Sequence, residues 1–138
     1  MTLTMQLLVN IVETYLEGLD TPYKIFRAEF DPQKVSSLPL AYIHANQTLL
    51  PAQIDYNQWS KETVINCTFV HKNKQSSSAD FDRVITDVRD ELISNLTPSQ
   101  RMSSVDIEQM ATTEGGEAPY TWVQAHYTIT KHLSLIHI

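Results

Sequence analysis

Apolar residues recur at helical spacing in two separate stretches of the chain, and each stretch predicts an amphipathic helix. In the first stretch, apolar side chains return every three or four positions: Met1, Met5, Leu8, Val12, Tyr15 and Leu19. Leu7 and Ile11 widen this stripe, so one face of the helix is expected to be well buried. We expect Gly18 to end the helix in the left-handed conformation and Pro22 to prevent it from resuming.

The second helical stretch follows a run of serines, where Ser77 and Asp80 have the spacing of an N-terminal cap. Its apolar stripe consists of Phe81, Val84, Ile85, Val88, Leu92 and Leu96. The charged residues lie away from that stripe: Asp82, Arg83, Asp87, Arg89, Asp90 and Glu91. Thr97-Pro98 is expected to end the helix, because proline cannot donate the hydrogen bond that a further turn requires.

Five other stretches alternate between apolar and polar residues, as is typical of β-strands. They cover Tyr23 to Phe30, Leu40 to Ala45, Trp59 to His71, a strand with Val105, Ile107, Gln109 and Ala111 on one side, and Tyr120 to Lys131. The order of elements is therefore α-β-β-β-α-β-β. We predict a single α+β domain over residues 1–132, with a mainly antiparallel sheet of about five strands and two helices packed on one face.

Two connections between the predicted strands are candidates for contacts with other proteins. The first contains Leu49, Leu50, Ile54 and Tyr56. These side chains are too apolar for a solvated loop, so they either extend the neighbouring strands or form an exposed apolar arm that contacts a protein. The second is the hairpin turn made of Glu114, Gly115, Gly116 and Glu117. Its paired glycines suit a tight, projecting turn.

The overall composition excludes several classes of partner. The chain has 138 residues, a formal net charge of -6 and a single cysteine, Cys67. Because its few basic residues are scattered, we expect no direct binding to nucleic acid or to an anionic membrane. A disulfide within the chain is impossible with one cysteine. No apolar run approaches the length of a membrane span.

The sequence predicts no enzyme, no metal site and no cofactor. His44, His71 and His126 fall in separate predicted strands, without the spacing of a metal-binding motif. Cys67 lies on the apolar side of a strand, where cysteine usually packs as a small hydrophobic residue. The acidic residues of the second helix form a solvated face or, alternatively, a contact surface for a basic partner.

The last six residues, Leu133-Ser-Leu-Ile-His-Ile138, need a separate interpretation. They can be read back as CTG TCT CTT ATA CAC ATC, which resembles a common transposase sequencing adapter. We therefore interpret residues 133–138 as adapter read-through and leave them out of the predicted domain. The alternative is a genuine terminal strand with alternating side chains.

The order of elements resembles that of the tail terminator proteins of long-tailed phages, also described as minor tail or tail completion proteins. Five segments carry the resemblance, which covers nearly the whole chain. They are the helix from Met1 to Leu19, Leu38-Pro39-Leu40-Ala41-Tyr42-Ile43, the strand from Trp59 to Val70, the helix from Ser78 to Leu96 and the strand from Trp122 to Thr130.

This resemblance implies a structural protein of the virion, assembled in the host cytoplasm and placed at the head-proximal end of the tail. It implies a hexameric ring of copies of the chain that caps the tail tube protein and meets a head–tail connector protein. A neck or head–tail adaptor protein is an alternative within virion assembly. A small cytoplasmic enzyme or ligand-binding domain is an alternative outside it.

Overall fold

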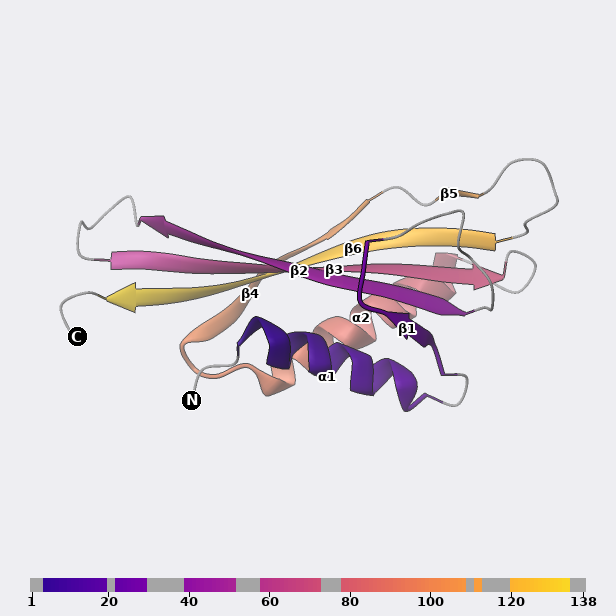
Figure 1. The fold of residues 1–138 in the computed structure, drawn as a ribbon, viewed down its shortest axis with the longest axis horizontal. Coiled ribbons are helices and arrows are strands. Elements are labelled where there is room, and N and C mark those ends of the chain that lie inside the picture. The colour runs from indigo at the N-terminus through magenta and orange to yellow at the C-terminus, as the bar shows by residue number, and fades with distance from the viewer. Residues whose placement is uncertain are drawn as a thin grey trace.

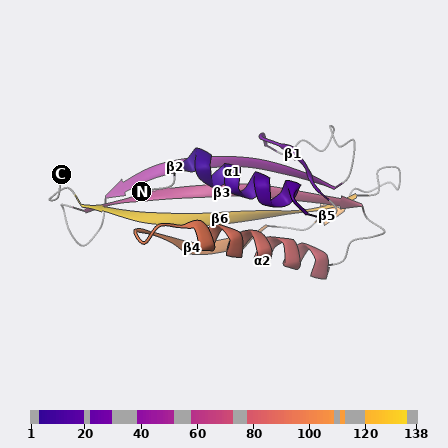
Figure 2. The ribbon, with the colours of Figure 1, turned by 90° about the horizontal axis from the view of Figure 1, so that it is seen from below.

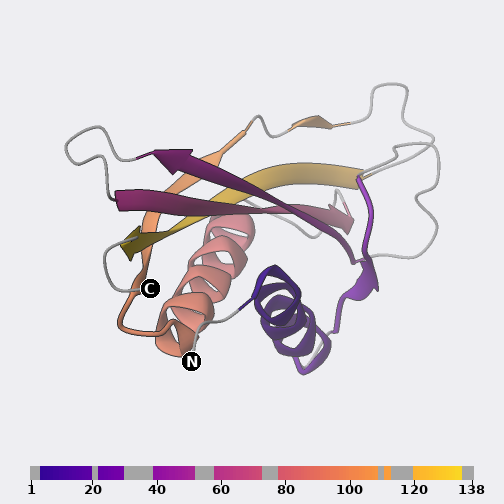
Figure 3. The same ribbon diagram turned by 60° about the vertical axis from the view of Figure 1, so that its left-hand side comes forward.

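The computed structural model describes residues 4–19, 22–29, 39–51, 58–72, 78–108, 111–112 and 120–134. Its elements are α1 (Met5–Glu17), β1 (Lys24–Phe26), β2 (Leu40–Pro51), β3 (Gln58–Lys72), α2 (Ser78–Asn95), β4 (Gln100–Ile107), β5 (Ala111–Thr112) and β6 (Tyr120–Ser134). Both helices lie on the same face of one twisted sheet (Figures 1 and 3). The predicted α+β fold, with two helices on one face of a mainly antiparallel sheet, is confirmed.

The strands follow the order β1-β2-β3-β6-β4, and β5 also pairs with β6. All pairs are antiparallel except β1 with β2, which run parallel. Helix α1 lies against β1, β2 and β3, whereas α2 lies against β4 and β6 (Figure 2). The long central strands β3 and β6 therefore join the two halves of the molecule.

The main core lies between the helices and the sheet. Its helical residues are Leu8, Val9, Val12, Leu16, Phe81, Val84, Ile85, Val88 and Leu92. Its sheet residues include Ala41, Ile43, Ile65, Cys67, Phe69, Val123, Ala125, Tyr127 and Ile129. Burial of each large apolar side chain stabilises the fold by about 1.5–3 kcal/mol, so this layer is the principal source of stability. The apolar stripe predicted for α2 is confirmed.

Both helices end near their predicted stops. Thr4 caps α1 by accepting a hydrogen bond from Leu7 N at 3.2 Å, so the helix begins at Met5. The left-handed stop predicted at Gly18 is wrong, because Gly18 has φ -86 and ψ 0 and its N–H reaches the carbonyls of Thr14 and Tyr15. Helix α2 ends at Asn95, shortly before Pro98.

Two predicted strands differ from those observed. Of the described residues in the predicted stretch from Tyr23 to Phe30, Lys24–Phe26 pair with the sheet and the others do not. In the hairpin, Ile107 pairs with Ala125 and Ala111 with Trp122, so one strand advances by one residue more than the other. The pairing with β6 therefore does not continue the predicted alternation from Ile107 to Ala111.

The sheet face without helices is also covered in places. Leu40, Tyr42 and Val70 form a second buried cluster, against which Phe26 and Trp122 pack. The rings of Phe26 and Tyr42 stack with centroids 5.1 Å apart. The alternation of β3 alone would place Asn66 and Thr68 in solvent, but only 8% and 2% of their surfaces are exposed.

Candidate functional site

A row of polar side chains crosses the helix-free face of the sheet. His44 in β2 pairs with Asn66 in β3, and Asn66 pairs with His126 in β6. Glu108, just beyond β4, completes this polar row, with its Oε1 3.1 Å from His126 Nε2. The sequence showed these histidines only in separate strands, and the register of the sheet brings them together.

Asn66 is the central group of the polar row. Its Nδ2 lies 3.2 Å from His44 Nε2, and its Oδ1 accepts a hydrogen bond from His126 Nδ1. An amide has one acceptor and two donor hydrogens, so it satisfies one protonated and one unprotonated imidazole nitrogen. His126 Nε2 is buried and makes no aligned hydrogen bond, although the carboxylate of Glu108 lies within ion-pair distance. The polar row is thus a structural network that fixes two imidazole rings.

Replacing Asn66 with leucine should lower the free energy of unfolding by about 1–3 kcal/mol, because two imidazole nitrogens lose their buried partner. Urea denaturation would measure this change. Asn46→Leu is the matched control, because Asn46 is an exposed amide in β2 that lies on the same face of the sheet as Asn66. A loss from Asn66→Leu no larger than that from the control would contradict the role assigned to the amide.

The described residues do not assemble a reactive centre. Within them, no group of three or more His, Cys, Asp or Glu side chains is arranged to hold a metal ion. His71, the third strand histidine, stacks on Phe81 with ring centroids 4.3 Å apart and hydrogen-bonds to the Tyr23 hydroxyl. His71 is therefore committed to packing between the sheet and α2.

Cys67 and Tyr127 lie in the main core, on the side of the sheet that faces the helices. Both side chains are fully buried, and burial raises the pKa of each well above its ordinary value. Tyr127 donates a hydrogen bond from its hydroxyl to the carbonyl oxygen of Ile85 at 2.8 Å, which ties α2 to β6. A buried thiol of raised pKa is a poor nucleophile, so Cys67 packs rather than reacts.

The acidic residues of α2 do not all lie on its outer side, because Asp87 is half-buried against Tyr15 of α1. Asp82 and Asp90 are exposed, and Arg89 donates a hydrogen bond to Asp90 from its Nη2 at 3.0 Å. The pKa of Tyr15 is raised, first by burial and then by the neighbouring Asp87, which also accepts its hydrogen bond. This face does not converge on a pocket within the described part of the chain.

Within the described residues, the outer edge of β2 is paired only at its beginning. Strand β1 pairs only with Leu40, Ala41 and Tyr42, and no other described strand pairs with the outer edge of residues 43–51. None of the described strands takes up the backbone N–H and C=O groups on this side, so a further strand can pair with them. We refer to the outer side of residues 43–51 as the open edge.

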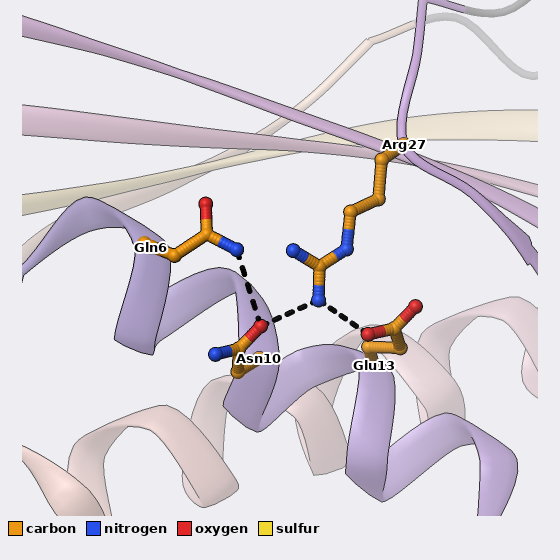
Figure 4. A network of polar contacts seen from close by, with 4 residues as sticks. All are labelled: Gln6, Asn10, Glu13 and Arg27. Atoms are coloured by element: carbon orange, nitrogen blue, oxygen red, sulfur yellow. Dashed lines mark hydrogen bonds and ion pairs between the residues drawn. The ribbon is translucent and has the colours of Figure 1, made fainter.

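Arg27, the first residue after β1, links the end of this strand to α1. Its guanidinium donates hydrogen bonds to Asn10 and Glu13 of α1, and Gln6 Nε2 lies 3.4 Å from Asn10 Oδ1 (Figure 4). After β1 the backbone rises away from α1, and only the side chain of Arg27 reaches back to the helix (Figures 1 and 4). The open edge begins at Ile43, the first residue of β2 beyond its pairing with β1.

A shallow hollow lies where the chain leaves the sheet. It is lined by Met5, Gln6, Val9, Arg27, Ile43, His44 and Ala45. Met5, Gln6 and Val9 belong to α1, and Ile43, His44 and Ala45 belong to β2, so the hollow lies between this helix and the edge strand. The hollow therefore adjoins the first residues of the open edge, on the side of the helices.

Two of the predicted interface residues belong to the described part of the chain. Leu49 and Leu50 belong to β2, paired with Lys61 and Ser60, so at these two positions the prediction of extended strands is confirmed over that of an arm. The remaining predicted interface residues lie outside the described ones: Ile54, Tyr56, Glu114, Gly115, Gly116 and Glu117. Strand β6 continues through Leu133 and Ser134, opposite Trp59 and Gln58.

The open edge was missed in the sequence, because a strand's alternation of side chains does not reveal whether its outer neighbour is present. One available signal was that residues 40–51 contain no charged side chain.

None of the described helices is both long and apolar enough to span a membrane. Compared with models of known protein families and with the sequences of curated proteins, the chain matches none.

Proposed function

We propose that this chain is a structural protein of virion assembly that resembles a phage tail terminator. In this proposal, copies of the chain form a closed ring on the head-proximal end of the tail tube. The ring stops further tube subunits from adding and presents a surface to the head–tail connector protein. The proposed location is therefore the virion, and the proposed activity is assembly rather than catalysis.

The observation that carries this proposal is the open edge of β2. A sheet with an uncovered, uncharged edge can be extended by a strand from another chain, whereas an isolated protein usually protects such an edge. The packing of Cys67, Tyr127 and His71 into the core supports assembly over catalysis, because these groups are engaged in structural contacts. The net charge of -6 further disfavours a direct contact with nucleic acid.

A tube-capping assay tests the proposal. A tail tube protein from the same genome would be allowed to polymerise with and without the purified chain. We expect shorter tubes that carry the chain at one end, because a terminator blocks the growing end. Electron microscopy would measure tube length and the position of the labelled chain.

Ser94→Lys is a suitable control variant, because Ser94 is exposed on α2, which lies against β4 and β6 rather than against β2. It should cap tubes as well as the unaltered chain does. Tubes of unchanged length at a molar excess of the chain would rule out a terminator. Binding to finished tubes without any effect on their growth would indicate a head–tail adaptor instead.

A further inference from the structure

We infer that the open edge of β2 receives strand β4 of a second copy of this chain, in an antiparallel, head-to-tail contact. The contact joins the two opposite outer edges of the sheet, so each copy offers one edge and accepts the other. The contact between the two strands is inferred from the sheet itself. That such contacts close into a ring rests on the proposed function. The occupant is thus a strand already present in the chain.

The directions of the strands favour this contact. Strand β3 is antiparallel to β2, β6 is antiparallel to β3, and β4 is antiparallel to β6. Strands β2 and β4 therefore run in opposite directions at the two sides of the sheet. When a second copy is placed beside the first with its helices on the same side, its β4 meets β2 as an antiparallel neighbour. A heterologous contact of this kind closes into a ring if the rotation between copies allows it.

The charges of the two edges are compatible. Residues 40–51 contain no Asp, Glu, Lys or Arg, so the open edge lacks the charged residues that usually discourage strand addition. Strand β4 carries Arg101 and Asp106, and Glu108 follows it. These groups would meet an uncharged strand, so a molecule with a net charge of -6 can bring two copies together here without facing like charges across the contact.

The apolar surfaces of the two edges lie on the same side. Ile107 in β4 is 54% exposed, and it pairs with Ala125, whose side chain faces the helices. Across the molecule, the hollow beside the open edge contains Met5, Val9 and Ala45, also on the side of the helices. A continuous sheet keeps side chains of one face together, so Ile107 would cover apolar surface of the neighbouring copy.

Strands β1 and β5 limit how the two copies align. Strand β1 fills the edge beside Leu40, Ala41 and Tyr42, and β5 pairs with Trp122 at the same level of the sheet. Two copies placed level with each other would therefore bring β1 and β5 together. A shift along the strand toward Pro51 relieves this overlap, and it has to be even in residues to keep each face intact. The smallest even shift that moves β5 past β1 places Ile107 opposite Gln47.

Cross-linking between cysteines at these two positions tests the contact. The double variant Gln47→Cys/Ile107→Cys would be treated with a short bis-maleimide at millimolar protein concentration, alone and with tube protein. Cys67 contributes little background, because it is completely buried. We expect a ladder of products from dimer to larger oligomers, since each copy has one donor and one acceptor position.

The single variant Gln47→Cys distinguishes the alternative arrangement. If two β2 edges pair with each other, this variant alone gives dimers and the double variant gives no ladder, which overturns the inference. The absence of any cross-linked product, with and without tube protein, overturns it as well. Circular dichroism of each variant would verify that it is folded, so that neither result reflects a loss of structure.

A charge placed in the open edge provides the second measurement. Thr48→Lys in the double-cysteine background should reduce the ladder at least tenfold, because Thr48 is exposed in the edge strand. Ser94→Lys in the same background should leave it unchanged. A ladder insensitive to Thr48→Lys would overturn the inference. A sensitive ladder from a chain that fails to cap tubes would leave the contact established and refute the terminator function, whereas capping without a ladder would do the reverse.

Discussion

Replacing Phe81 with alanine should lower the free energy of unfolding by about 3–5 kcal/mol. Phe81 is 1% exposed and stacks on His71 with an interplanar angle of 9°. Its removal leaves a cavity between α2 and β3, and it also exposes one face of a buried imidazole. A domain of this size is stable by about 5–15 kcal/mol, so the change would approach global unfolding. Urea denaturation followed by circular dichroism would measure it.

Two variants separate the packing of Phe81 from a general effect on α2. Phe81→Leu retains most of the volume and should cost less than about 1.5 kcal/mol. Ile93→Ala removes an apolar side chain that is 46% exposed on the same helix, and it should change stability by about 0.5 kcal/mol or less. If Phe81→Ala resembled Ile93→Ala, the contact of α2 with His71 would not support the fold.

Alkaline conditions should unfold the protein through Cys67 and Tyr127. Burial raises the pKa of both groups in the folded state, whereas in the unfolded chain they ionise near about 8.5 and 10. Above those values the unfolded state has released protons that the folded state retains, so stability falls as the pH rises. Each group contributes a slope of up to about 1.4 kcal/mol per pH unit. Urea denaturation between about pH 8 and 11 would measure the slope.

Single replacements assign this slope to its two groups. Cys67→Ala should remove the part that begins near pH 8.5, and Tyr127→Phe the part that begins near pH 10, both approximate values for the unfolded chain. Tyr127→Phe also loses the hydrogen bond to the Ile85 carbonyl, so at neutral pH it should cost about 1 kcal/mol. An unchanged alkaline slope in the double variant would show that other groups govern the alkaline transition.

The same burial predicts that Cys67 resists thiol reagents. In the folded state the thiol is neither accessible nor ionised, so labelling requires the sheet to open. The native protein should therefore react at least about a thousandfold more slowly than the urea-unfolded chain, which corresponds to about 4 kcal/mol of opening free energy. Labelling at equal rates in both states would contradict the placement of Cys67 in the core.

The sequence by itself determined the elements whose side chains all have one kind of environment. The stripe from Phe81 to Leu92 has a period that only a helix satisfies, so α2 and its buried face could be predicted. The alternation of Ile65, Cys67 and Phe69 similarly identified the helix-facing side of β3. Local spacing is sufficient in these cases, because each apolar residue has one favourable direction.

Only the tertiary structure decided which strands lie next to each other in the sheet. Asn66 is polar yet buried because His44 and His126 arrive beside it from strands distant in the sequence. Among the described strands, none lies along the outer side of β2 beyond Tyr42, because β1 ends at Phe26. A strand's own sequence specifies its two faces but not its two edges, since edges are satisfied by backbone groups that every residue shares.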